Sequence, residues 1–144
     1  MSKERLYLYD TTLRDGAQTT GVDFSLSDKR RIIRVLDELG IDYIEGGYPG
    51  ANTTDSELFA ARPDLMSARF TAFGMTKRAG RSVSNDPGLQ AVLQSKADSI
   101  CLVAKSWDYH VRVALGITND ENLEAIDQSV GAIRETQREA MIDC

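Results

Sequence analysis

Residues 25–50 read SLSDKRRIIRVLDELGIDYIEGGYPG, and in this stretch a helix is followed directly by a strand. Ser25 and Asp28 have the spacing of a capping box, so the helix is predicted to begin there. The apolar positions after the box recur at helical period: Ile32, Ile33, Leu36 and Leu39. Gly40 is a natural helix end. Residues 43–45 then predict a buried strand, which the glycines and the proline of residues 46–50 terminate.

The same alternation of short apolar runs and longer amphipathic stretches extends along the whole chain. Three further runs predict strands: residues 6–9, 69–73 and 99–104. The other stretches predict helices: a short one at residues 55–61, one that begins at Asp86-Pro87, a short one at residues 108–115 and a long one from Asn119. Strands that alternate with helices pair in parallel through right-handed crossovers. The predicted fold class is therefore α/β, with about four βα units in one domain.

Two architectures are built from this alternation, an open doubly wound sheet and a (β/α)8 barrel. A doubly wound sheet that binds a nucleotide carries a glycine-rich phosphate turn directly after its first strand. Here that turn is DTTLRDG at residues 10–16, which is charged and contains no G-x-G-x-x-G motif. Periodicity alone leaves both architectures open.

Composition excludes several classes of protein. The 144 residues carry 17 Lys and Arg against 22 Asp and Glu, a net charge of −5, so no basic surface for nucleic acid is expected. No apolar run reaches the roughly 18 residues of a membrane span, and residues 1–10 lack the apolar stretch of a signal peptide. The two cysteines, Cys101 and Cys144, do not form a disulfide framework. We therefore expect a cytoplasmic protein without nucleic-acid or membrane partners.

The chemically informative segment is DTTLRDGAQ at residues 10–18, just past the C-terminal end of the first predicted strand, where α/β active sites collect. Together with YIEGGYP at residues 43–49, it resembles the DRE-TIM metallolyases, which include 2-isopropylmalate, homocitrate and citramalate synthases and 3-hydroxy-3-methylglutaryl-CoA lyase. The strings DGAQTTGVDFSLSDK and DYIEGGYPGAN resemble the citramalate synthase branch. The resemblance implies that residues 1–144 are the N-terminal half of a (β/α)8 TIM barrel. They would be a partial catalytic domain that lacks the second half of the barrel and any regulatory domain.

The family motif also implies roles for single residues. Asp15 matches a ligand of a divalent metal, Mg²⁺, Mn²⁺ or Zn²⁺, which a 2-oxo acid chelates through its carboxylate and keto oxygens. Arg14 would lie over the oxygen that becomes an alkoxide or enolate, where a fixed cation stabilises the developing charge. Glu45 would orient Arg14, and Gln18 matches a position close to the substrate oxygens.

Further residues follow the third and fourth predicted strands and are expected near the substrate. Phe73, Met75 and Leu102 are candidates for the pocket that holds the side chain of the oxo acid, with plain core packing as the alternative. In relatives the loop after the fourth strand borders the substrate pocket, so contacts are expected from Lys105, Ser106 and His110. His110 can equally be a surface or cap residue of the helix at residues 108–115.

The resemblance implies an acyltransferase that performs a metal-dependent Claisen condensation of acetyl-CoA with a 2-oxo acid. Pyruvate is the first choice, citramalate the product, and CoA is then released; such enzymes serve isoleucine and leucine biosynthesis. Three alternatives stay open: a 2-isopropylmalate synthase that uses 2-oxoisovalerate, a carbon–carbon lyase similar to HMG-CoA lyase, and an inactive half-barrel that acts in assembly. Ala17 stands where isopropylmalate and homocitrate synthases often carry Glu, which weakens the first alternative.

A complete barrel of this kind has eight strands and about 250 residues, whereas four strands are predicted here. We therefore expect the chain to be inactive alone, with the general base, a His-x-His pair and the other metal ligands lying outside it. Its open edges would be the first and fourth strands. Open edges and uncovered apolar faces favour a homodimer or a larger oligomer.

Overall fold

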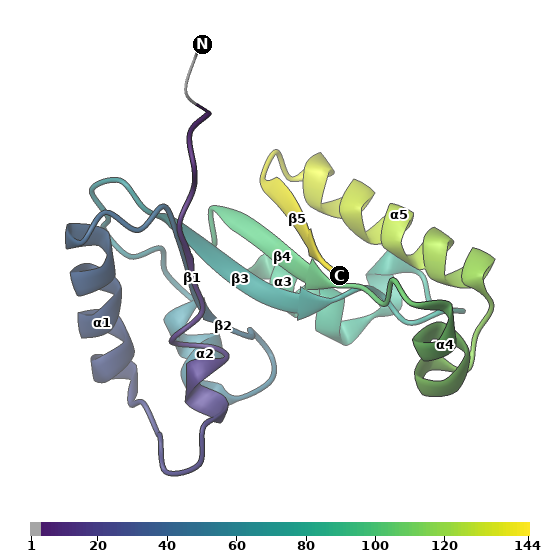
Figure 1. The fold of residues 1–144 in the computed structure, drawn as a ribbon, viewed down its shortest axis with the longest axis horizontal. Coiled ribbons are helices and arrows are strands. Elements are labelled where there is room, and N and C mark those ends of the chain that lie inside the picture. The colour runs from purple at the N-terminus through teal and green to yellow at the C-terminus, as the bar shows by residue number, and fades with distance from the viewer. Residues whose placement is uncertain (1–3) are drawn as a thin grey trace.

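Five parallel strands form a single sheet in the computed structural model, which describes residues 4–144 (Figure 1). The strands are β1 (Tyr9–Asp10), β2 (Tyr43–Gly47), β3 (Arg69–Met75), β4 (Ser99–Val103) and β5 (Glu139–Asp143). Their order across the sheet is their order along the chain, and each pairs in parallel with the next. In a doubly wound sheet, the order in which successive strands are added reverses at a switch point. The described sheet has no such reversal, so its winding is that of a barrel.

The helices lie between the strands. They are α1 (Leu26–Glu38), α2 (Thr53–Leu58), α3 (Pro87–Gln94), α4 (Asp108–His110) and α5 (Asn119–Glu135), with short helical turns at Gly16–Gln18, Val83–Asn85 and Val111–Leu115. All of the described α-helices except α4 begin at a side-chain cap. Capping boxes at Ser25 and Thr118 start α1 and α5. The helix predicted at residues 55–61 begins earlier, at Thr53, because the Asn52 side chain accepts from the Asp55 N–H at 2.7 Å. None of the described helices is long and apolar enough to cross a membrane.

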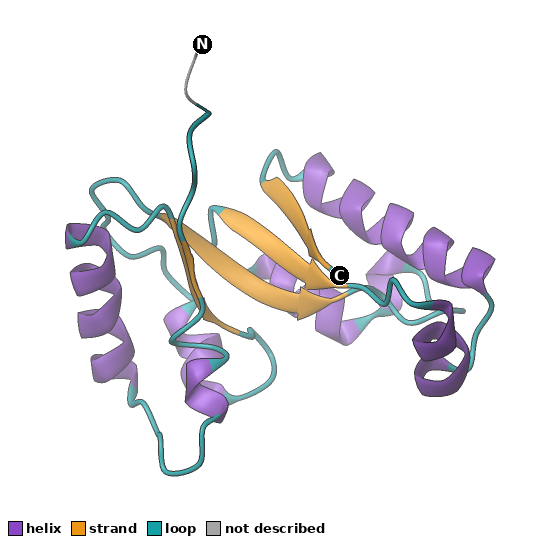
Figure 2. Ribbon diagram, in the orientation of Figure 1, coloured by secondary structure: helices purple, strands orange, loops and turns teal. Residues whose placement is uncertain are grey.

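The two faces of the sheet differ in what covers them. Alternate residues of a strand point to opposite faces, and the outward set is completely buried against the helices: Ile44, Phe70, Ala72, Ile100 and Leu102. Figure 2 shows α3 behind β3 and β4, with no helix over the near face of these two strands. The inward set is more polar and includes Tyr43, Glu45, Thr71, Phe73 and Ser99. This inward face is where the functional side chains gather.

The prediction of four strands is wrong by one. Residues 139–143, EAMID, pair with β4 along its whole length, from Ser99 opposite Glu139 to Val103 opposite Asp143. The strand begins and ends on a carboxylate, so it gives no continuous apolar run. The open edges are therefore β1 and β5, and β4 is an interior strand.

The first predicted strand also differs from the structure. Residues 6–9 were expected to form a buried strand, but the ladder is confined to Tyr9–Asp10. Leu6, Tyr7 and Leu8 are 86%, 59% and 56% exposed. The segment before β1 extends beyond the sheet (Figure 1), where it has only β2 as a neighbour and cannot be covered on both sides.

Asp37, near the end of α1, fixes the entrance to β3. Its carboxylate accepts hydrogen bonds from the backbone N–H groups of Ser67 at 3.0 Å and Ala68 at 2.8 Å, and also from that of Met66. Burial by itself would raise the pKa of Asp37, but these donors outweigh it and hold the pKa below its usual value. The side chain is only 5% exposed, so these bonds are sheltered from water.

We predict that Asp37→Ala lowers the free energy of unfolding by about 1–3 kcal/mol, because three backbone N–H groups, of which that of Ala68 is buried, lose their acceptor. Since the pKa of Asp37 is lower in the folded than in the unfolded state, its stabilising effect is present above pH ~4 and is lost as the pH falls. Urea unfolding at several pH values measures both effects. Glu38→Ala, an exposed neighbour on the same helix, is the control. Equal losses for the two variants would contradict the role given to Asp37.

Candidate functional site

The segment after β1 is folded by its own side chains and carbonyls. Asp10 accepts hydrogen bonds from the N–H and the hydroxyl of Thr12, both at 3.0 Å. The carbonyl of Thr11 accepts from the N–H groups of Arg14, Asp15 and Gly16 at 3.1, 2.8 and 3.2 Å. Such a turn is the kind that Asp and Thr favour, because their side chains bond to nearby backbone groups. The turn presents Arg14 and Asp15 at the C-terminal edge of the sheet.

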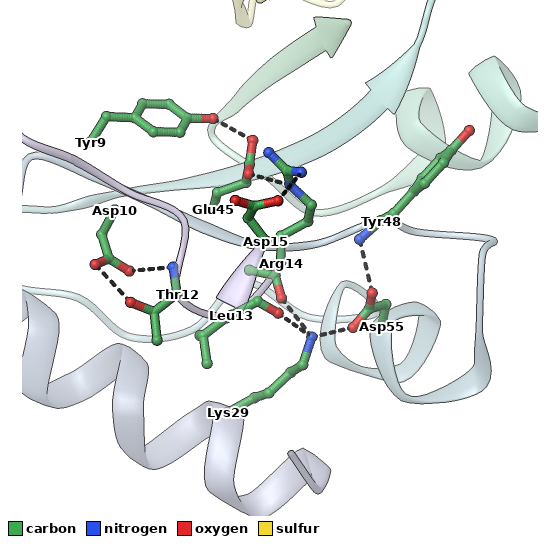
Figure 3. Close-up of polar contacts among 11 residues, drawn as sticks. Tyr9, Asp10, Thr12, Leu13, Arg14, Asp15, Lys29, Glu45, Tyr48 and Asp55 are labelled. Carbon is green, nitrogen blue, oxygen red and sulfur yellow. Dashed lines mark hydrogen bonds and ion pairs between the residues drawn. The ribbon is translucent and has the colours of Figure 1, made fainter. Parts of the chain in front are cut away.

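Arg14 is held on three sides, as Figure 3 shows for its polar contacts. Its Nε donates to Glu45 Oε2 at 2.7 Å, and its Nη1 donates to Asp15 Oδ1 at 3.2 Å. The guanidinium carbon lies 4.0 Å from the centre of the Phe73 ring, which is close enough for a cation–π interaction. The charge-assisted contact between Arg14 and Glu45 that the sequence predicts is thus present. No hydrogen-bond partner for Nη2 occurs among the described residues, so this nitrogen can donate to a ligand.

Both oxygens of Glu45 are occupied. Tyr9, whose ring stacks on Tyr43, donates its hydroxyl to Glu45 Oε1 at 2.7 Å. Glu45 is 1% exposed, so Tyr9 and Arg14 together satisfy a carboxylate that water barely reaches. Burial, and then the charge of Glu45, raise the pKa of the Tyr9 hydroxyl. Tyr9 therefore remains a hydrogen-bond donor at neutral pH.

Asp15 is the exposed member of the cluster. Its side chain is 63% exposed, and one of its oxygens accepts a hydrogen bond from Arg14. The other oxygen can bind a hard cation such as Mg²⁺ or Mn²⁺. The described residues contain no group of three or more His, Cys, Asp or Glu side chains that could enclose a metal ion. Asp15 thus fits one ligand position, and waters, substrate oxygens or further protein groups would fill the others.

Lys29 of α1 binds the segments that carry Arg14 and Glu45. Its ammonium donates to the carbonyls of Leu13 and Gly46, each at 2.9 Å, and forms an ion pair with Asp55 (Figure 3). The side chains of Lys29 and Asp55 are 5% and 8% exposed. Leu13 precedes Arg14 and Gly46 follows Glu45, so one buried cation fixes both the turn after β1 and the end of β2.

Asp55 extends this network to the next loop. Its second oxygen accepts from the backbone N–H of Tyr48 at 2.9 Å and from Asn52 Nδ2 at 3.1 Å. The Tyr48 ring meets Phe73 edge-on, 5.5 Å between centres. The buried carboxylate therefore sets the position of the aromatic pair beside Arg14.

A cavity of about 390 Å³ opens in front of these groups. Its lining includes Arg14, Gln18, Tyr48, Asp55 and Phe73. Cavities of a few hundred Å³ with a small number of fixed polar groups hold small molecules. The structure thus places two of the predicted substrate-binding residues, Gln18 and Phe73, in the wall of the same cavity as Arg14.

The HMGL-like family model matches residues 5–144, almost the entire chain, including every residue of the cluster. The chain belongs to the HMGL-like family. Among curated proteins it is 44% identical over 142 residues to an (R)-citramalate synthase from Aquifex aeolicus and 45% identical over 144 residues to one from Streptomyces coelicolor. These matches cover 97% and 98% of this chain but only 27% of either relative, so the chain spans about a quarter of their length.

Solved structures show the same fold. The hydroxymethylglutaryl-CoA lyase from Pseudomonas aeruginosa superimposes with a TM-score of 0.74 at 21% identity, over 96% of this chain and 45% of the lyase chain. The HMGL-like chain therefore forms the N-terminal part of a TIM barrel, a five-stranded half-barrel. This confirms the architecture that the resemblance implied, with one strand more than predicted.

Other predicted site residues do not line the cavity of Arg14 in this HMGL-like structure. Leu102 is completely buried on the helix side of β4, and an added Cβ at Gly74 would lie 3.1 Å from it, so it packs in the core and not in the pocket. Lys105 uses its carbonyl to accept from Asn122 at 2.9 Å. His110 lies on α4 with its ring 4.6 Å from that of Trp107. No polar contact joins Lys105, exposed Ser106 or His110 to Arg14 in residues 4–144.

Lys29, Asp55 and Tyr9 are the site residues that sequence reasoning missed. A signal for Lys29 exists in the helical pattern, because Lys29, Ile33 and Asp37 are spaced by four and form the buried stripe of α1. A charge within an apolar stripe indicates a buried partner. For Tyr9 the signal is its spacing of two from Tyr7, which is typical of one strand face; in the structure only Tyr9 lies in β1, opposite Tyr43 and on the face of Glu45.

We predict that Lys29→Met destabilises the protein by about 3–5 kcal/mol, because Asp55 stays buried without its partner. The double variant Lys29→Met/Asp55→Asn should lose less than the sum of the two single losses. Denaturant unfolding of the three variants gives the coupling energy directly. Strict additivity would mean that the pair does not act as one unit.

Proposed function

We propose that this HMGL-like chain binds the 2-oxo acid and its metal in an acyltransferase that condenses acetyl-CoA with pyruvate. The products would be citramalate and free CoA. The observation that carries the proposal is the Arg14 guanidinium, which Glu45 and Phe73 hold at the edge of the 390 Å³ cavity with one nitrogen free to donate. The identity of 44–45% to (R)-citramalate synthases supports pyruvate as the oxo acid.

In this reaction the methyl carbon of acetyl-CoA loses a proton and forms a bond to the keto carbon of pyruvate. The keto oxygen becomes an alkoxide, which takes up a proton, and water then cleaves the thioester to release CoA. The free donor of Arg14 stabilises the oxygen as its charge grows. Because Glu45 and Phe73 fix the guanidinium before substrate arrives, little reorganisation is needed when that charge appears.

A divalent cation bound at Asp15 would polarise the keto group of the oxo acid. Arg14 Nη1 and Asp15 Oδ1 are 3.2 Å apart, so guanidinium and carboxylate would lie next to the same substrate oxygens. Gln18 and Tyr48 also line the cavity.

Five strands supply part of such a site, and the sequence contains one histidine, His110, so the His-x-His pair that the resemblance implies for the metal is not among these residues. We therefore expect the 144 residues assayed alone to form no citramalate. The uncovered inward face and the edges at β1 and β5 favour association with another half-barrel, which completes the sheet.

We predict that Arg14→Lys, in the protein at its full natural length, lowers kcat by about 10²–10³-fold, because lysine keeps the charge but loses the forked geometry. The KM for pyruvate should change much less, since the interaction is strongest in the transition state. Steady-state assays with pyruvate and with the bulkier 2-oxoisovalerate also test the choice of substrate. Arg31→Lys on the exposed face of α1 is the control.

Two results would contradict this assignment. A loss confined to KM would make Arg14 a substrate clamp. Turnover of 2-oxoisovalerate in preference to pyruvate would replace citramalate by isopropylmalate as the product.

We predict that Asp15→Asn weakens Mn²⁺ binding by at least about tenfold, because an ionised oxygen ligand is lost. Electron paramagnetic resonance of free Mn²⁺ measures the affinity without any need for turnover. Asp23→Asn is a matched control, since Asp23 is an exposed carboxylate in the wall of the same cavity. If both variants bind Mn²⁺ equally well, the metal does not contact Asp15.

A further inference from the structure

A second cavity, of about 640 Å³, lies beside the one that contains Arg14. Tyr48 lines both cavities, and its ring contacts Phe73, which in turn lies under Arg14. The larger cavity is bordered by the loop at residues 76–82 that follows β3, by the start of α3 and by α5. The strands β3 and β4 point toward this edge of the sheet (Figure 1).

The loop at residues 76–82 contributes three cations to the wall of the larger cavity. Lys77, Arg78 and Arg81 all line it, against a single carboxylate, Asp86. In residues 4–144 none of the three cations forms an ion pair with a carboxylate, and neither arginine side chain donates a hydrogen bond. Unpaired cations of this kind attract an anionic ligand.

Lys77 is the strongest single indication. It is 5% exposed, and its ammonium makes one hydrogen bond, to the carbonyl of Arg81 at 2.9 Å. An ammonium has three donors, and a buried cation with so little compensation is costly unless an anion binds there. Lys77 and Arg81 also line a neighbouring hollow together with Glu121 and Glu124. Neither glutamate forms an ion pair with them in residues 4–144: Glu121 caps α5 through Thr118, and Glu124 accepts from Gln128.

The loop that carries these cations is firmly held. The Lys77 N–H donates to Ser129 of α5 at 2.9 Å, and the Arg78 N–H donates to Asp86 at 2.9 Å. Asp86 also accepts from the Leu89 N–H at 3.0 Å, so its carboxylate is used within the protein. Burial would raise the pKa of Asp86, but these bonds and the nearby arginines outweigh it and hold the pKa below its usual value. The binding surface is thus preformed.

The rest of the lining is largely apolar. It includes Met75, Ala114, Leu115, Ile117 and Ala125. A ligand that suits this cavity carries several negative charges at one end and has an uncharged body that packs on aliphatic side chains. Because Tyr48 lines both cavities, a long ligand in this cavity can extend toward Arg14.

We propose that Lys77, Arg78 and Arg81 bind the phosphate groups of coenzyme A, whose uncharged pantetheine arm then passes Tyr48 toward Arg14. This assignment rests on the proposed function, which requires an acyl-CoA beside the oxo acid. Coenzyme A matches the cavity because its diphosphate and its 3′-phosphate lie at one end and its thiol at the other. Arginine forks bind phosphate oxygens in pairs, which fits two arginines on one short loop.

The test is calorimetric titration of coenzyme A into the protein at its full natural length. Arg78→Gln/Arg81→Gln should bind coenzyme A at least about tenfold more weakly, since each lost charge-assisted bond is worth roughly that factor. Both arginines are exposed, so the variant is expected to fold. Arg30→Gln/Arg31→Gln, two exposed arginines of α1, is the matched control and should bind as the wild type does.

Two further ligands separate the phosphate groups. Pantetheine carries no phosphate, so the wild type and the Arg78/Arg81 variant should bind it equally. Dephospho-coenzyme A lacks the 3′-phosphate. If the Arg78/Arg81 variant loses as much affinity for it as for coenzyme A, the arginines contact the diphosphate. If the variant loses no affinity for it, the arginines contact the 3′-phosphate. Three results would overturn the assignment: the variant binds coenzyme A with the affinity of the wild type, the variant loses as much affinity for pantetheine as for coenzyme A, or the wild type fails to bind coenzyme A.

Failure of this inference and failure of the proposed function are distinguishable. If the protein condenses acetyl-CoA with pyruvate and the variant keeps its KM for acetyl-CoA, the cavity is wrongly assigned while the function stands. If coenzyme A binds through the arginines but no 2-oxo acid is converted, the cavity is correctly assigned and the condensation is not the reaction.

Discussion

The ammonium of Lys29 connects helix α1 to the turn after β1, to the end of β2 and to helix α2. It lies in the interior, where an ion costs several kcal/mol to desolvate unless hydrogen bonds and a counter-charge replace water. The carbonyls of Leu13 and Gly46 and the carboxylate of Asp55 provide that replacement. Each comes from a different segment, so removal of any one leaves the charge under-compensated. The positions of Arg14 and Glu45 follow, since they are the immediate chain neighbours of the two carbonyls.

The glycines after β2 allow this arrangement. An added Cβ at Gly46 would lie 2.5 Å from Phe70 Cε2, in the stacked pair that Phe70 forms with Phe59. A valine could therefore not fit beside Phe70 at this position. Gly47 has φ +150°, and a side chain there would collide with the Asp55 carboxylate. The close approach of the Asp55 carboxylate to the backbone therefore excludes any larger residue.

Much of the fold follows from local signals, because apolar runs, capping boxes and breakers act within a few residues. The interior strands β2, β3 and β4 and the starts of α1 and α5 are of this kind. The contact between Arg14 and Glu45 came from the family motif, and the structure contains it. The predictions that were wrong or missing concern features that depend on residues distant in the sequence. β5 is a strand because β4 offers it a partner, and the side of the sheet on which Leu102 lies is set by the pleat of the strand. The network of Lys29 was hidden because a lysine next to a helix start is normally exposed.

The charges of α1 run against the electrical polarity of the helix. A helix favours anions near its N-terminus and cations near its C-terminus, whereas the buried stripe of α1 begins with Lys29 and ends with Asp37. Neither charge stabilises an isolated helix. Each is compensated only when α1 docks on the sheet: Lys29 by a carbonyl beyond the C-terminal end of β1, and Asp37 by a backbone N–H just before β3. Helix α1 and the turn of Arg14 therefore form one cooperative unit. The amide hydrogens of α1 should exchange with solvent through the same opening that releases the arginine, and the guanidinium has its working geometry only in molecules whose first helix is docked.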